Sequence, residues 1–237
     1  MAYTPTVWKN GEFPPIDAEH LNKIEQGIAN SAPGGFGIGT RSKWLTNADD
    51  LNNIYQGGFY FWYGDNIPAN APDGIAYGGM IVMSRSATEF VQQVFNITDI
   101  SSLQNCMLVR TAYNNTWYPW EWINPPMELG VEYRTTERYL GKPVYTKVVE
   151  GSFSGAGVTN INHGIANIDK CVAATGIALQ KDSSYNFSFP YWFTNGSTLT
   201  QGLSVSINTS SIALNSVTNY AETFSVQVTI KYTKTTD

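Results

Sequence analysis

The hydrophobic positions near the N-terminus form one narrow stripe. Leu21, Ile24 and Ile28 are spaced by three and four residues, which predicts a short amphipathic helix. Asp17 is a suitable N-cap, and the helix is expected to end near Ser31. So short a helix is marginal alone in water, and its stripe is too thin to build a core. Two interpretations stay open: identical copies pack their stripes together as in a coiled coil, or the helix docks on its own domain.

Between residues 40 and 124 the pattern changes to short apolar runs separated by turn residues. Residues 47–55 have a helical pattern that Gly57-Gly58 ends. Strands are then expected over 59–63, 79–84, 90–97, 107–113 and 117–123. The first of these runs is entirely aromatic, which favours a buried strand. Asn114-Asn115 predicts the turn of a hairpin between the last two.

Beyond residue 140 the pattern is that of short strands. Residues 224–232 alternate apolar and polar side chains, as a strand with one buried face does. Repeated strands with turns between them predict an antiparallel β-sandwich. The fold class expected is therefore mainly β, with a short coiled-coil-like helix, a small mixed α+β domain and a C-terminal sandwich. The boundaries expected are 1–36, 37–126, a connector over 127–142, and 143–237.

Composition narrows the class of protein. The chain has 237 residues, of which 14% are charged and 14% aromatic, a balance that suits an extracellular β protein with ring-rich binding surfaces. A net charge of −5 without a Lys/Arg run argues against nucleic-acid binding. No apolar run approaches the roughly 18 residues of a membrane span, so no membrane insertion is expected. Cys106 and Cys171 are expected to be free, buried thiols in different domains.

The titratable residues do not form a catalytic pattern. From residue 151 onward the acids are Asp169, Asp182, Glu222 and Asp237, and none belongs to a carboxylate pair of the kind that cleaves glycans. The chain has two histidines, His20 and His163. The simplest interpretation of His163 is a hydrogen-bonded turn residue; three copies meeting on an axis around a metal are the alternative. We expect no enzyme activity, no cofactor and no metal site.

Two ring-rich segments are the candidate binding sites. Tyr185, Trp192 and Asn195 lie in one segment, and Tyr113 and Trp117 flank the expected hairpin turn. Rings can stack on sugar faces while amides bond to hydroxyls, so these residues suit a glycan receptor. The alternative for the first segment is that Trp192 fills a subunit interface.

The N-terminal segment TPTVWKNGEFPPIDAEHLNKIEQGI, residues 4–28, resembles the start of tail-fibre and receptor-binding proteins of bacteriophages and prophages. The resemblance implies attachment to a virion and trimer formation through this segment. It also implies that the stripe of Leu21, Ile24 and Ile28 is the trimerisation seam.

Two further stretches resemble domains of such fibres. Gly58-Phe59-Tyr60, Gly79 to Val82, Gln92 to Phe95, Arg110, Trp117, Trp120 and Trp122 resemble the knob domain first described in pyocin and phage tail fibres. Residues 142–147, 163–169, 190–191 and 230–234 resemble their lectin-like C-terminal head.

Together the resemblances imply a homotrimeric, non-catalytic receptor-binding protein of a phage tail. It would join tail or baseplate proteins through its N-terminus, adhere to glycan on a bacterial surface, and belong to the virion. The alternatives are a stand-alone bacterial lectin or adhesin and a glycan depolymerase.

Overall fold

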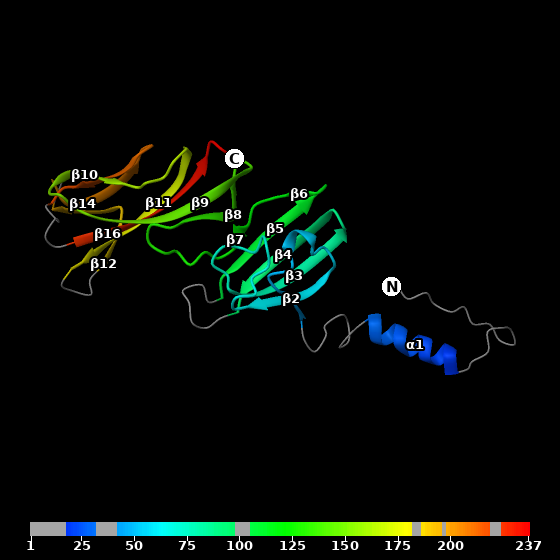
Figure 1. The fold of residues 1–237 in the computed structure, drawn as a ribbon. Helices are drawn as coiled ribbons and strands as arrows, with labels where there is room; N and C mark the ends of the chain where they lie inside the picture. Colours follow the sequence, from blue (N-terminus) through cyan, green and yellow to red (C-terminus); the bar gives the residue numbers. More distant parts are fainter. Residues whose placement is uncertain (1–17, 32–41, 98–104, 182–185, 196–197, 219–223) are drawn as a thin grey trace. The chain divides into compact units, whose positions relative to one another are not determined.

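The computed structural model describes residues 18–31, 42–97, 105–181, 186–195, 198–218 and 224–237. The chain is mainly β, as predicted, and divides into two compact units (Figure 1). The first unit comprises the chain up to Asn105 together with Arg110–Tyr118. The second comprises Cys106–Val109 and Pro119–Asp237. Residues 119–126, which the sequence groups with the middle domain, thus belong with the C-terminal unit.

The N-terminal helix α1 (Ala18–Ser31) has the expected length. Its expected N-cap, Asp17, lies outside the described residues, as does the side chain of Ile28. Leu21 is 50% exposed and Ile24 is half-buried, so part of the stripe is accessible to solvent. Pairing of copies along this stripe stays a prediction. Over the described ranges, no helix combines the length and the apolar character needed to cross a bilayer.

The strands of the first unit have the order β1-β2-β3-β4-β5, and β6 also pairs with β5, whose first residues, Met107–Val109, are counted with the second unit. Strands β2, β3 and β4 are antiparallel, whereas β1 is parallel to β2. Their bounds are β1 (Lys43–Trp44), β2 (Gly58–Tyr63), β3 (Tyr77–Ser86), β4 (Glu89–Asn96), β5 (Met107–Tyr113) and β6 (Thr116–Trp117).

The helix expected over residues 47–55 is much shorter: only the 3-10 helix η1 (Leu51–Asn53) forms. Side chains compete with helical backbone bonding here. The Asp49 carboxylate accepts from the Thr46 amide at 2.8 Å, and the Asp50 carboxylate accepts from the Asn52 amide at 2.8 Å. These bonds fold the segment into turns.

The aromatic run of β2 predicted a buried strand, but only one face of β2 is buried. Tyr60 and Trp62 point into the core, whereas Phe59 and Tyr63 are exposed and Phe61 is half-buried. Trp62 is fully buried and its indole N–H donates to the Ile75 carbonyl at 3.0 Å. The sheet is therefore covered by protein on one face, and the other face is lined by rings.

The second unit contains two sheets. One has the order β7-β8-β9-β16-β11-β12, and the other β10-β15-β14-β13. Their bounds are β7 (Glu121–Trp122), β8 (Glu132–Tyr139), β9 (Lys142–Ser152), β10 (Gly157–Asn162), β11 (Ile168–Gln180), β12 (Asn186–Phe189), β13 (Tyr191–Asn195), β14 (Thr198–Ile207), β15 (Ser211–Ser216) and β16 (Phe224–Lys234). Strand β8 lies within the segment expected as a connector.

A single cluster of buried side chains joins these two sheets. Val226, Val228 and Ile230 of β16 pack with Ile212 and Leu214 of β15. The alternation predicted for residues 224–232 is confirmed, since the apolar positions of β16 are buried and the polar positions between them are less so.

Both cysteines are free thiols, as expected. Cys106 is buried, but Cys171 is exposed, contrary to expectation. Both belong to the second unit rather than to different domains. Cys171 is opposite Tyr232 in the sheet and lines an open groove, which explains its contact with solvent.

Candidate functional site

A pocket in the first unit combines rings, amides and an ammonium group. It has a volume of about 210 Å³ and is lined by Lys43, Asn53, Ile54, Tyr55, Gln56 and Tyr60. We call it the Tyr55–Tyr60 pocket. The Tyr60 side chain is buried, and its hydroxyl donates to the Gln56 carbonyl at 2.7 Å. Burial raises the pKa of Tyr60, so this hydroxyl stays protonated at neutral pH.

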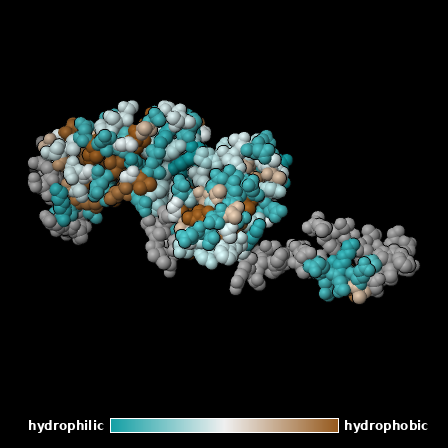
Figure 2. Space-filling view, viewed as in Figure 1, coloured by the Kyte–Doolittle hydropathy of each residue, from teal (hydrophilic) through white to brown (hydrophobic). Residues whose placement is uncertain are grey.

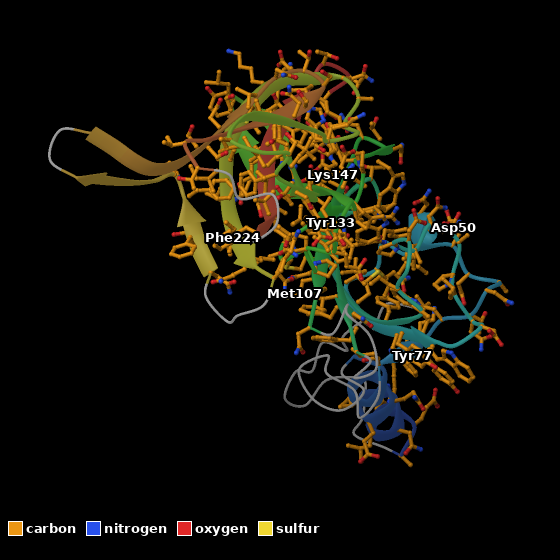
Figure 3. All side chains as sticks on the ribbon, turned by 90° about the vertical axis from the view of Figure 1, so that its left-hand side faces the viewer. Asp50, Tyr77, Met107, Tyr133, Lys147 and Phe224 are labelled. Carbon is orange, nitrogen blue, oxygen red and sulfur yellow. The ribbon has the colours of Figure 1, made fainter. Side chains whose placement is uncertain are left out.

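The wall of the pocket is the loop that follows Asp50. This residue, labelled in Figure 3, caps η1 and also accepts from the Asn70 side-chain amide at 2.7 Å. Leu51 is fully buried, and its amide donates to the Ala69 carbonyl at 3.0 Å. The beginning of the loop is therefore hydrogen-bonded to the rest of the unit. This attachment fixes the positions of Asn53 and Tyr55 in the wall of the pocket.

A buried glutamine holds the same loop from inside. The Gln92 amide nitrogen donates to the Leu51 carbonyl at 2.6 Å and to the Ile54 carbonyl at 2.9 Å. The Gln92 carbonyl accepts from Nε of Arg110 at 2.9 Å. Gln92 is fully buried and Arg110 is 6% exposed. Burial lowers the pKa of Arg110 to about 10, against the opposing effect of the Asp50 carboxylate, and the guanidinium stays charged at neutral pH.

A chain of ring contacts that ends at Tyr55 also supports the pocket. The Arg110 guanidinium lies 3.9 Å from the centre of the Trp117 ring. Trp117 meets Phe90 edge to face at 5.0 Å, and the Tyr55 ring lies 6.4 Å from Phe90. Trp117, a predicted receptor contact, thus supports Arg110 and, through Phe90, the ring of Tyr55.

The groups lining this pocket suit the binding of a small polar molecule with an apolar face. Tyr55 is 41% exposed and offers a ring surface. The amides of Asn53 and Gln56 carry both donors and acceptors, and Lys43 adds donors and a positive charge. A sugar ring presents this combination of a C–H face and hydroxyl edges.

The predicted hairpin turn is confirmed. Asn114 and Asn115 both have positive φ, 49° and 61°, which is the conformation of a two-residue hairpin turn. Tyr113 is 53% exposed at its start, and Trp117 is half-buried at its end. The turn brings both residues to one end of the hairpin, but of the two rings it is Tyr113 that is mainly exposed to solvent.

Of the other three predicted receptor residues, the structure describes only the backbone of two. Tyr185 lies outside the described residues, and the side chains of Trp192 and Asn195 are also outside them. The backbone shows that Trp192 and Asn195 belong to strand β13, at one edge of the four-stranded sheet. Trp192 pairs with Gly202 and Asn195 with Thr198 of β14. Their part in receptor contact stays a prediction.

The second unit has a larger but more apolar hollow. This groove has a volume of about 580 Å³ and is lined by Cys171, Val172, Ala173 and Ala174 of β11, Pro190, and Ser204, Val205 and Ile207 of β14. Figure 2 shows hydrophobic residues at the surface of this unit. Although Cys171 is exposed, the groove walls partly desolvate its thiol and raise its pKa, which keeps the thiol protonated at neutral pH. The groove offers few groups that could pair with hydroxyls, so it suits an apolar occupant.

His163 is a hydrogen-bonded turn residue, as the simplest interpretation held. It is 2% exposed, and its Nδ1 accepts from the Ile165 amide at 3.0 Å. Nε2 therefore carries the proton and donates to the Asn208 carbonyl at 3.2 Å. Both ring nitrogens are occupied by protein groups. Within the described ranges, no three His, Cys, Asp or Glu residues are grouped to hold a metal ion.

Sequence reasoning missed the Tyr55–Tyr60 pocket. Residues 47–55 were expected to be helical and Tyr60 to belong to a buried strand. The run Asn52-Asn53-Ile54-Tyr55-Gln56 carries amides beside a ring and precedes two glycines. That combination is the one local sign that the segment is an exposed turn.

No protein-family model matches the chain, and no curated protein matches it either. Among solved structures, it is similar to an N-truncated R2-type pyocin tail fibre, with a TM-score of 0.30 and 12% identity over 81% of this chain and 98% of that one. It is also similar to C-terminal parts of two P. aeruginosa pyocin fibres. The R1 fibre gives a TM-score of 0.32 and 11% identity over 85% of this chain and 69% of that one. The R2 fibre gives a TM-score of 0.31 and 12% identity over 83% of this chain and 68% of that one.

Proposed function

We propose that this chain is a receptor-binding tail-fibre protein that adheres to bacterial surface glycan without cleaving it. The observation that carries the proposal is the Tyr55–Tyr60 pocket, where an exposed ring lies beside two amides and an ammonium group. The resemblance of residues 4–28 and of the knob and head motifs to phage tail fibres provides the biological setting. The virion would be the site of the protein, and tail or baseplate proteins its attachment partners.

Binding through such a pocket is weak for a single copy. A small, open pocket buries little of a sugar chain, and each hydrogen bond contributes only about 1 kcal/mol net. Several copies acting on one surface convert weak single sites into firm adhesion. The proposal therefore includes a homotrimer, with Leu21, Ile24 and Ile28 in the seam between helices.

Adhesion is tested with the full chain on an array of bacterial surface polysaccharides. Tyr55→Ala and Asn53→Ala should each weaken binding at least tenfold, which corresponds to a loss of about 1.4 kcal/mol. The unfolding temperature should change little, since Tyr55 is exposed. Tyr118→Ala is the control, because Tyr118 is 52% exposed and does not line the pocket.

The same array separates the competing sites. If Trp192→Ala or Tyr113→Ala removes binding while Tyr55→Ala leaves it intact, the receptor site is the one predicted from sequence and not the pocket. Release of reducing ends from a bound polysaccharide would contradict the non-catalytic part of the proposal.

Trimer formation is tested by light scattering. The unmodified chain should give three times its 26.2 kDa mass. Changing both Leu21 and Ile24 to Asp should weaken assembly, because the new charges would crowd one axis. A monomer mass for the unmodified chain at every concentration would rule out the trimer.

A further inference from the structure

The sheet of the first unit exposes a continuous apolar face. We call it the outer sheet face and define it by its exposed side chains, which are Trp44, Phe59, Tyr63, Tyr77, Met83 and Ile97. Their exposed fractions lie between 39% for Phe59 and 57% for Ile97. The pairing of β2 with β3 sets Phe59 opposite Ile81 and Tyr63 opposite Tyr77, so these rings share one face. Tyr77 is labelled in Figure 3.

This face is distinct from the Tyr55–Tyr60 pocket. Side chains alternate along β2, so the buried Tyr60 and Trp62 lie on the opposite side of the sheet from the outer sheet face. On the outer side, Trp44 lies 5.4 Å from Tyr63, with their ring planes 13° apart. Phe61 is nearly parallel to both rings. The exposed side chains therefore form a packed layer and are not isolated surface residues.

The outer sheet face carries no charged side chain over residues 59–63, 77–83 and 91–95, and the nearest charges along β3 and β4 are the Arg85–Glu89 ion pair beyond Met83. The side chains that 59–63, 77–83 and 91–95 direct to it are aromatic or aliphatic, apart from Gly79 and Gln93. Monomeric soluble proteins rarely expose a continuous apolar patch of more than a few hundred Å², and larger ones mark interaction sites. Six large side chains exposed by about half present on the order of 500 Å². This approaches the roughly 800 Å² that each partner buries in a standard interface.

We infer that the outer sheet face is the contact between copies of this chain. The molecule carries a net charge of −5, so identical copies repel one another at long range. An uncharged face is where two copies approach without juxtaposing like charges. Sugar fits less well, because three neighbouring rings already stack on one another and few polar groups are present to pair with hydroxyls. Each hydroxyl buried without a partner costs about 1–3 kcal/mol.

The inference adds a second contact to the proposed trimer, outside the helix seam, and does not depend on what the pocket binds. It is tested on the full chain with Met83→Asp and, as a matched control, Val158→Asp. Met83 is 56% exposed on β3, and Val158 is 60% exposed on β10 of the other unit. Sedimentation equilibrium over a concentration series should show at least a tenfold weaker self-association for Met83→Asp and no change for Val158→Asp.

A second measurement uses the unmodified chain and does not depend on the folding of a variant. Oxidation of Met83 by hydroxyl radicals should slow as protein concentration rises, because the copies cover its thioether. A chain that is monomeric at every concentration, a Met83→Asp variant that assembles normally, or a concentration-independent oxidation rate would each overturn the inference.

The outcomes also separate this inference from the proposed function. If the Leu21 and Ile24 variant dissociates while Met83→Asp does not, the outer sheet face is not the contact, and the helix seam and adhesion proposals stand. If Met83→Asp instead removes glycan binding without changing the mass, the face is a sugar site and the inference is wrong.

Discussion

Replacing Gly78 by alanine is expected to lower the free energy of unfolding of the first unit by about 4 kcal/mol. A Cβ atom at this position would lie 2.1 Å from the Trp62 ring. The ring is fully buried and is held by its hydrogen bond to Ile75, so it cannot move away without breaking that bond or displacing the core. Calorimetry should show the transition of this unit lowered by roughly 15 °C or more.

Gly79→Ala is the matched control, since it is the next residue on the same strand and faces the opposite side. Its added Cβ would lie 3.3 Å from Cγ2 of Ile97, whose exposed side chain can turn aside. The expected change is below about 1 kcal/mol, because the methyl group also restricts the unfolded chain. If the Gly78 and Gly79 variants are equally stable, the backbone of β3 does not pack as closely on Trp62 at Gly78 as the structure has it.

Gln92→Leu is expected to lower stability by about 3 kcal/mol and to loosen the wall of the pocket. Leucine has a similar volume but cannot donate to the Leu51 and Ile54 carbonyls or accept from Arg110. A buried guanidinium that loses a partner adds to this cost. Hydrogen exchange at the amides of residues 51–56 should accelerate, and glycan binding should fall with it.

Gln93→Leu is the control for Gln92→Leu. It shows whether the loss of stability comes from the buried hydrogen bonds of Gln92 or from the removal of any side-chain amide on β4. Gln93 is adjacent in sequence, but it lies on the outer sheet face and is only half-buried. We expect little change in stability and none in the exchange of residues 51–56. If the two variants are equally destabilised, or if the loop amides exchange as before in Gln92→Leu, the proposed role of Gln92 is wrong.

Elements with a strong local pattern were predicted well. The helix at residues 18–31, the alternating strand β16 and the Asn114-Asn115 turn are all formed. In each case the deciding physics is local: the spacing of apolar positions or the tolerance of asparagine for positive φ. The segment 47–55 failed because carboxylate side chains of Asp49 and Asp50 bond to nearby backbone amides, a competition that periodicity does not register.

The candidate site was much harder to predict. The Tyr55–Tyr60 pocket joins residues from β1, the η1 loop and β2, and its support comes from Gln92 and Arg110 on other strands. In sequence, Gln92 is one polar residue in a strand pattern. Only the fold shows that it lies 2.6 Å from a carbonyl that is 41 residues away along the chain.

By itself the sequence determined the mainly β class, the N-terminal helix and the ring-rich, charge-poor character of the chain, because each depends on residue type and short spacing. Only the tertiary structure decided which face of the aromatic strand β2 is core and which is exposed. A strand of rings has no polar side to reveal its orientation, so the choice depends on what covers each face. Here the η1 loop and Ile75 cover Tyr60 and Trp62, while Phe59 and Tyr63 stay at the surface.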